Sequence, residues 1–84
     1  MKLKEFTKKY IFQSAQVRVY EQVGEGEYRP IKEDAIGVYS ARDIISGKKL
    51  KAYGDRQVIG LADLKHLAYT NAISIIVAPE METT

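Results

Sequence analysis

The most apolar segment of the chain lies near its end and predicts the centre of the fold. Residues 72–78 are rich in β-branched side chains and lie between Thr70-Asn71 and Pro79. The segment is too short for a membrane span and is typical of a strand buried inside a sheet. One face of this strand carries Ile73, Ile75 and Val77, and the other face carries Ser74, Ile76 and Ala78. Because both faces are mostly apolar, we expect a helix or a second subunit to cover the second face.

The N-terminal segment has the spacing of a short amphipathic helix. Leu3, Phe6 and Tyr10 recur at helical intervals, and most positions between them are charged. We predict a helix from about Lys2 to Tyr10. A helix of this length is not stable alone in water, so it must pack on a sheet. Its apolar stripe is a candidate cover for the second face of the strand at residues 72–78.

A β-hairpin is predicted next. Residues 16–22 alternate apolar and polar positions, and Gly24-Glu25-Gly26 supplies the turn. The return strand, from Tyr28 to Ile31, lies at a sheet edge or is interrupted at Pro30, because proline cannot donate to a central ladder. The two glycines do not belong to a dinucleotide-binding motif, since Arg29 stands where the third glycine is required and no helix follows.

A second, smaller helix is predicted in the middle of the chain. Extended character resumes from Ala35 to Tyr39 through two apolar positions. Ser40 then has the position of an N-cap, with Asp43 three residues later, as in a capping box. We therefore predict a helix from Ala41 to Ser46 that ends at Gly47.

The segment from Gln57 to Tyr69 fits both a helix and a pair of strands. We predict strands at about residues 58–61 and 64–69, the second leading as a hairpin arm into the apolar strand. The predicted fold class is α+β: a short N-terminal helix packed on a mainly antiparallel sheet of four to five strands, with one small additional helix. Residues 1–78 form a single compact domain in this interpretation, and residues 79–84 form a frayed tail.

Composition limits the setting in which the protein works. The chain has 84 residues and no cysteine, so neither disulfides nor thiolate metal sites are available. No segment approaches the length of a membrane helix, and no apolar signal region follows the N-terminal charges, which favours the cytoplasm. A chain of this size has a small core, so we expect a homo-oligomer. The net charge of +2 is low for a protein dedicated to nucleic acid.

The loop after the second helix is the candidate binding site. It lies between Gly47 and Arg56 and carries four cations and an aromatic ring, which together suit the phosphate and the base of a nucleotide. An ordinary solvated loop is the alternative. The loop lacks the remaining residues of a P-loop, so it does not predict phosphate hydrolysis. The candidate ligand-binding residues are Lys48, Lys49, Lys51, Tyr53 and Arg56.

Catalytic and metal-binding patterns are missing from the sequence. It contains no cysteine nucleophile, no HExxH motif and no Gly-x-Ser-x-Gly motif. His66 is the single histidine and cannot form a metal site alone, so we interpret it as a surface or interface residue. The acidic pairs Glu25 with Glu27 and Glu33 with Asp34 stand in apparently exposed loops. We therefore expect a protein that is not an enzyme and uses no cofactor or metal.

Three of the segments together resemble a group of known proteins. They are the opening Met-Lys-Leu-Lys-Glu-Phe, the strand at Val17-Arg18-Val19-Tyr20 with its acidic hairpin, and residues 67–75. Their layout resembles that of small accessory proteins of phages and mobile elements in Gram-positive bacteria. The insertion from Gln22 to Gly54 is longer than in the shorter members of that group. The resemblance implies a non-enzymatic binding protein that acts in the host cell cytoplasm, often against host immunity.

These observations leave three hypotheses for the function. The first is a homo-oligomeric counter-defence protein that sequesters a phosphate-bearing nucleotide signal through the basic loop. The second is an inhibitor that binds a host defence protein directly, through a strand edge or a tyrosine-rich surface. The third is a nucleic-acid-binding accessory factor, for which the overall charge gives less support.

Overall fold

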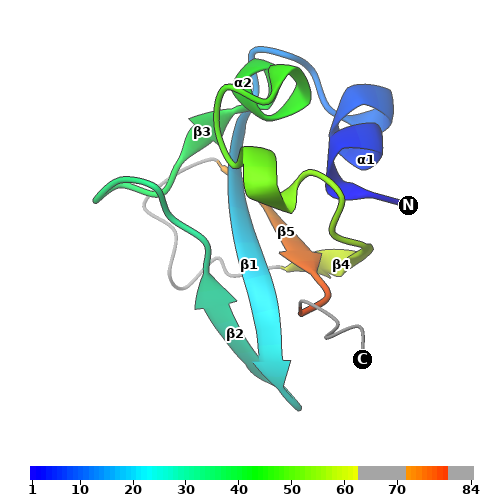
Figure 1. Ribbon diagram of the computed structural model, residues 1–84, viewed down its shortest axis with the longest axis vertical. Helices are drawn as coiled ribbons and strands as arrows, with labels where there is room; N and C mark the ends of the chain where they lie inside the picture. Colours follow the sequence, from blue (N-terminus) through cyan, green and yellow to red (C-terminus); the bar gives the residue numbers. More distant parts are fainter. Residues whose placement is uncertain (63–71, 80–84) are drawn as a thin grey trace.

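A computed structural model of the chain describes residues 1–62 and 72–79, and these form an α+β fold (Figure 1). A sheet of five strands is accompanied by two short α-helices and one 3-10 helix. The elements in chain order are α1 (Leu3–Tyr10), β1 (Gln16–Gly24), β2 (Glu27–Pro30), β3 (Tyr39–Ser40), α2 (Ala41–Ser46), η1 (Lys51–Tyr53), β4 (Val58–Ala62) and β5 (Ile73–Val77).

The sheet is mixed, with β1 as its longest strand. The strand order is β2-β1-β5-β4, and β3 pairs with the first residues of β1. β1 and β5 run parallel, with Val19 opposite Ile75, while the other pairings are antiparallel. The predicted α+β class is confirmed, as are the N-terminal helix, the hairpin with its edge strand ending at Pro30, and the internal apolar strand.

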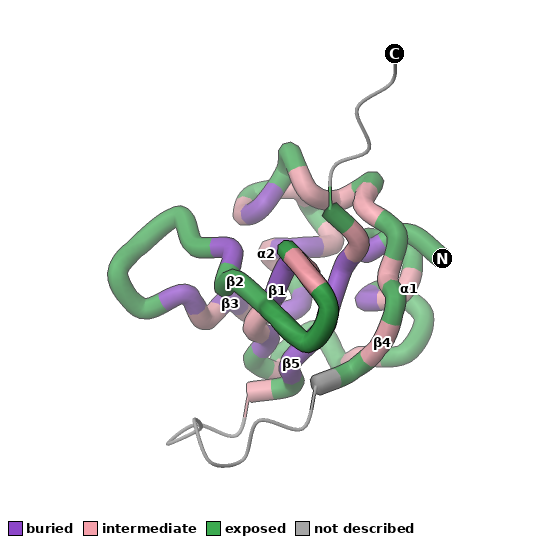
Figure 2. The backbone as a smooth tube through the Cα atoms, turned by 90° about the horizontal axis from the view of Figure 1, so that it is seen from below, coloured by how far each residue is buried: buried purple, intermediate pink, exposed green. Residues whose placement is uncertain are grey.

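The core lies between one face of the sheet and the helices. Val17 and Val19 of β1 share this face with Ile75 and Val77 of β5, and all four are buried (Figure 2). Buried side chains from the helical segments complete the cluster: Leu3, Ala41, Ile44 and Leu50. α1 therefore covers the face that carries Ile75 and Val77, so the prediction that it covers the opposite face was wrong. Strand periodicity separates the two faces but does not tell which one meets the helix.

α1 is fixed to the chain that precedes β4. The Leu3 N–H donates to the Arg56 carbonyl at 2.8 Å, and the Val58 N–H donates to the Met1 carbonyl at 2.8 Å. Within the helix, Leu3 and Thr7 are fully buried, and the Thr7 hydroxyl donates to the Leu3 carbonyl at 2.7 Å. These bonds satisfy polar groups that would otherwise be buried without a partner. The sheet thus supplies the support that a helix of eight residues needs.

Residues 35–39 do not form the extended segment that the sequence predicts. Only β3 is a strand here, because the Asp34 carboxylate accepts the N–H groups of Ile36 at 2.9 Å and Gly37 at 2.8 Å. Such a side-chain turn competes with strand pairing for the backbone. Gly37 has φ of +69°, a conformation that suits glycine. The hydrogen bond from Gly37, more than any other interaction, holds the pKa of Asp34 below its ordinary value.

α2 forms as predicted. The Ser40 hydroxyl accepts the Asp43 N–H at 3.3 Å at the N-terminus, and Gly47 ends the helix in the left-handed conformation with φ of +80°. The strand predicted near residues 58–61 is β4. The predicted strand at residues 64–69, His66 and most of the predicted tail lie outside the described residues.

Candidate functional site

The basic loop after α2 is folded around a buried leucine. Leu50 is 1% exposed and has φ of +55°, a left-handed conformation that is unfavourable for a branched side chain. Its N–H donates to the Glu33 carboxylate at 2.7 Å, and the Glu33 N–H donates in turn to the Tyr39 hydroxyl. The burial of the side chain and this hydrogen bond offset the backbone strain. The loop is therefore a fixed part of the fold and not a loosely attached segment.

Arg56, one of the predicted ligand-binding residues, is bound to the body of the protein. Its Nη1 lies 2.8 Å from Oε2 of Glu21 and 3.2 Å from the Ala78 carbonyl. Its guanidinium also lies 5.0 Å from the centre of the Tyr53 ring, which packs against the core. The Arg56 side chain is 15% exposed. Arg56 and Tyr53 therefore hold the end of the loop against β1 and the end of β5.

Glu21 is the acidic centre of this arrangement. Its carboxylate, on β1, is 10% exposed and also accepts a 2.7 Å hydrogen bond from Arg29 on β2. Burial alone would raise the pKa of Glu21, but the hydrogen bonds from Arg56 and Arg29 outweigh it and hold the pKa below its ordinary value. The carboxylate is therefore ionised at neutral pH, and it joins two strands to the basic loop.

The three predicted lysines lie at the surface of the loop. Lys48 and Lys51 are exposed, and Lys49 is half-buried with its N–H donating to the Asp43 carbonyl. Lys51 lines a hollow of about 220 Å³ together with Lys4 of α1, a residue that the sequence analysis did not select. The other residues lining this hollow are Ile44, Ser46, Gly47, Gly54 and Asp55. Among the five predicted residues, Lys51 is thus the one that meets a lysine from another element.

Positive charge is concentrated in the segments that carry the helices. We call residues 1–12 and 41–55, which contain α1, α2 and η1, the helical layer. Eight lysines or arginines stand there against three acidic residues, giving +5, whereas the remaining sequence has five against eight, giving −3. In the part of the chain that the structure describes, the layer's cations form one ion pair, Lys2 with Asp55 at 3.8 Å. A segment-by-segment charge count would have found this asymmetry. The cations are Lys2, Lys4, Lys8, Lys9, Arg42, Lys48, Lys49 and Lys51.

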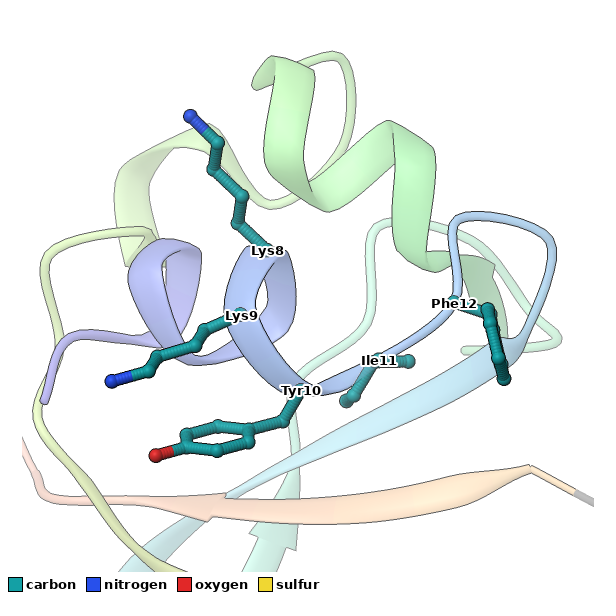
Figure 3. Close-up of a pocket in the computed structure, with 5 residues that line it drawn as sticks. All are labelled: Lys8, Lys9, Tyr10, Ile11 and Phe12. Carbon is teal, nitrogen blue, oxygen red and sulfur yellow. The ribbon is translucent and has the colours of Figure 1, made fainter.

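A second hollow of about 340 Å³ lies at the C-terminal end of α1, lined by residues 8–12 (Figure 3). It brings Lys8 and Lys9 together with Tyr10 and Phe12, whose side chains lie on either side of Ile11 in this view. Tyr10 is 60% exposed and Phe12 is 86% exposed. Lys8 and Lys9 also line a wider hollow with Met1 and Glu5. The helical spacing predicts Tyr10 in the apolar stripe of the helix, and no motif in the sequence indicates Phe12.

The side chains on these surfaces determine which groups could bind there. Lysine ammonium groups and aromatic rings can hold phosphates and flat apolar groups. Across residues 1–62 and 72–79, histidine and acidic side chains form no cluster of three that would bind a metal ion. No helix in the same residues has the length and apolar character needed to cross a membrane.

Comparison with known proteins gave no match for this chain among family models, curated proteins or solved structures.

The role of Leu50 can be tested by comparing two leucines. Leu50→Ala should lower the free energy of unfolding by about 2–5 kcal/mol, because the buried side chain leaves a cavity. Leu61→Ala is the matched control, since Leu61 is 59% exposed, and it should change stability by less than about 0.5 kcal/mol. Urea denaturation measures both. Equal effects would contradict the burial of Leu50 in the core.

The Glu21 cluster makes stability depend on pH in a defined direction. At neutral pH, Arg56→Ala should lower the free energy of unfolding by about 3 kcal/mol, since it removes a principal partner of a buried carboxylate. The folded-state pKa of Glu21 lies below the ordinary value of 4.5, so the stabilisation is present above pH 4.5 and is lost on acidification through the folded-state pKa. The difference between wild type and Arg56→Ala should therefore shrink in acid.

Lys48→Ala is the control for this experiment, because Lys48 is exposed and forms no ion pair among the described residues. Its effect on the free energy of unfolding should stay below about 0.5 kcal/mol. The difference in free energy of unfolding between wild type and Arg56→Ala could instead stay constant from neutral pH down to pH 3. That result would show that Arg56 does not stabilise the protein through the Glu21 carboxylate.

Proposed function

We propose that this protein is a non-enzymatic binding protein that captures a phosphate-bearing nucleotide ligand on its helical layer. The observation that carries the proposal is the concentration of +5 charge on that layer, against −3 in the rest of the sequence. A surface of this kind attracts phosphate groups from a distance.

The lysines of the layer favour a phosphate ligand because most of them form no ion pair with a carboxylate among the described residues. Lys4, Lys8, Lys48 and Lys51 are exposed and form no ion pair among the described residues. A lysine binds phosphate as a mobile point charge with three donors. Within the originally predicted set, we therefore assign ligand contact to Lys48, Lys49 and Lys51, and we assign Arg56 and Tyr53 to positioning the loop.

The phage context that the resemblance implies supplies a biological role for binding a phosphate-bearing ligand. An accessory protein that holds a nucleotide signal lowers the free concentration available to the host's immune response, and this requires no catalysis. We propose that capture of this kind, by a homo-oligomer in the host cytoplasm, is the biological role. The resemblance in layout supports the context, and the basic layer supports the ligand class.

A second candidate, inhibition of a host protein through a strand edge, is favoured by β4. Ile59 is 48% exposed and Leu61 is 59% exposed on this strand, which ends the order β2-β1-β5-β4. The N-terminal segment forms a bridge from Lys2 to Gln57, just before β4 begins. Strand edges with apolar side chains and no charged residue are sites where another chain can pair.

The nucleotide proposal is tested by reversing one charge at a time. Lys51→Glu in the helical layer and Lys32→Glu outside it make the same change in net charge, and both lysines are exposed. Native mass spectrometry and calorimetry with a panel of linear and cyclic nucleotides measure binding. Lys51→Glu should weaken binding about tenfold or more, because a hydrogen bond between charged groups contributes about 1.5 kcal/mol or more.

Lys32→Glu should bind like the wild-type protein to within about twofold, since Lys32 lies outside the helical layer and any screened long-range effect is small. Equal losses in the two variants would indicate a general charge effect and contradict a site on the layer. A wild-type protein that binds no phosphate-bearing compound in low salt would contradict the proposed function.

The strand-edge candidate makes a different prediction about association. Ile59→Lys places a charge on the β4 edge and should prevent strand pairing there, because an edge lysine would have to be desolvated on pairing. Sedimentation velocity compares this variant with wild type. If β4 pairs copies of the chain, the wild-type protein sediments as an oligomer and Ile59→Lys as a monomer. Identical sedimentation of the two would exclude this edge as a contact between copies of the chain.

A further inference from the structure

The two aromatic rings at the end of α1 are exposed although their backbone is firmly held. The Phe12 carbonyl accepts the Ala15 N–H at 3.0 Å, and the Gln13 carbonyl accepts the Arg42 N–H at 3.0 Å. The Ala15 carbonyl accepts the Ala41 N–H at 2.9 Å, so the loop is bound to the first turn of α2. Phe12 is thus displayed to solvent at 86% exposure from a fixed position.

Tyr10 is held by a different contact. Its ring lies 5.1 Å from the ring of Phe6, which packs against the core. A ring supported on one side and 60% exposed offers its remaining surface without a large loss of side-chain freedom on binding. The Tyr10 ring is therefore positioned for stacking before any ligand arrives, whereas for Phe12 the backbone is what is held.

Three cations lie in the same region of the molecule as these two rings. The Lys9 Nζ lies 5.5 Å from the centre of the Tyr10 ring, and Lys8 lines the same hollow. The exposed Arg42 is joined through its backbone to Gln13, the residue that follows Phe12. None of these three cations forms an ion pair with another described residue. The surface thus combines apolar rings with positive charge.

We infer that this surface, made of Tyr10 and Phe12 with Lys8, Lys9 and Arg42, binds single-stranded nucleic acid by base stacking. The inference rests on the proposed function and names its ligand class. Exposed bases stack on aromatic rings whatever their sequence, while the backbone phosphates meet the cations. In a duplex the base faces are already stacked on one another, so they are not available to the rings of Tyr10 and Phe12. A mononucleotide offers one base to two rings and so leaves part of the surface unused.

The rest of the helical layer extends this surface. Lys4 and Lys51 line one hollow, and Lys8 and Lys9 line the hollow at the other end of α1. A strand anchored at the rings can therefore continue along the helices in contact with further lysines. Single-strand sites of known proteins cover about 4–16 nucleotides, so an oligonucleotide of about ten is a suitable probe.

The test measures fluorescence anisotropy of a labelled ten-nucleotide oligothymidine with the intact chain. Phe12→Ala should weaken binding about 5- to 150-fold, the range for loss of one stacking ring. Ile36→Ala is the matched control, because Ile36 is an exposed apolar residue outside the helical layer, and its affinity should stay within about twofold of wild type. Phe12→Tyr keeps an aromatic ring and should retain binding. Thermal melting of each variant checks that it is folded.

Salt and competitor experiments separate this inference from the proposed function. With three cations in contact, raising the salt from 50 to 200 mM should weaken binding about 20-fold. If duplex DNA or a thymidine mononucleotide binds as tightly as the oligonucleotide, the stacking inference is overturned. If Lys51→Glu weakens oligonucleotide binding and Phe12→Ala does not, the proposed function stands and the aromatic surface is excluded. If neither oligonucleotide nor mononucleotide binds, both fail.

Discussion

The ion cluster at Glu21 is the interaction on which the arrangement of this protein depends. One carboxylate on β1 accepts hydrogen bonds from Arg29 on β2 and from Arg56 at the end of the basic loop, and Arg56 also donates to the Ala78 carbonyl after β5. The Arg56 backbone carbonyl accepts the first N–H of α1. Segments far apart in the sequence thus meet at one guanidinium, so the position of the helical layer over the sheet follows from this cluster. Removing one partner of such a buried charge is costly, because the other remains without compensation.

The helical layer carries a different electrostatic arrangement. At Glu21 opposite charges meet at hydrogen-bonding distance, whereas the layer gathers cations that are almost all without an acidic partner among the described residues. Like charges held near one another destabilise a compact state, and a bound anion relieves this repulsion. A ligand that binds the folded state also stabilises it by mass action. These properties are the reason for proposing the layer as a ligand-binding surface, and the exposed rings of Tyr10 and Phe12 add an apolar component to it.

Much of the fold follows from the sequence, and the failures have physical causes. Helical spacing identifies α1 and strand alternation identifies β1, because burial of one face imposes these periods, whereas a short apolar run rich in β-branched residues identifies β5. Ser40 with Gly47 marks both ends of α2. The sequence does not show which sheet face α1 covers, since both faces of β5 are apolar. It predicts an extended segment at residues 35–39, where the Asp34 side chain instead forms a turn with Gly37.

The candidate site was found in part. The basic loop is visible in the sequence as a cluster of charges, but the function of each side chain depends on its partner. Arg56 is held inward because Glu21, 35 residues away in the sequence, lies beside it in the fold, and the Tyr53 ring packs under its guanidinium. Lys4 joins Lys51 only through the packing of α1. The most direct test of ligand binding on the helical layer is a two-dimensional NMR titration with the single-stranded oligonucleotide. Binding on this layer predicts amide shift changes at residues 8–12, Arg42 and Lys48–Lys51, and none in the β1–β2 hairpin. Changes confined to the hairpin or to β4 would contradict it.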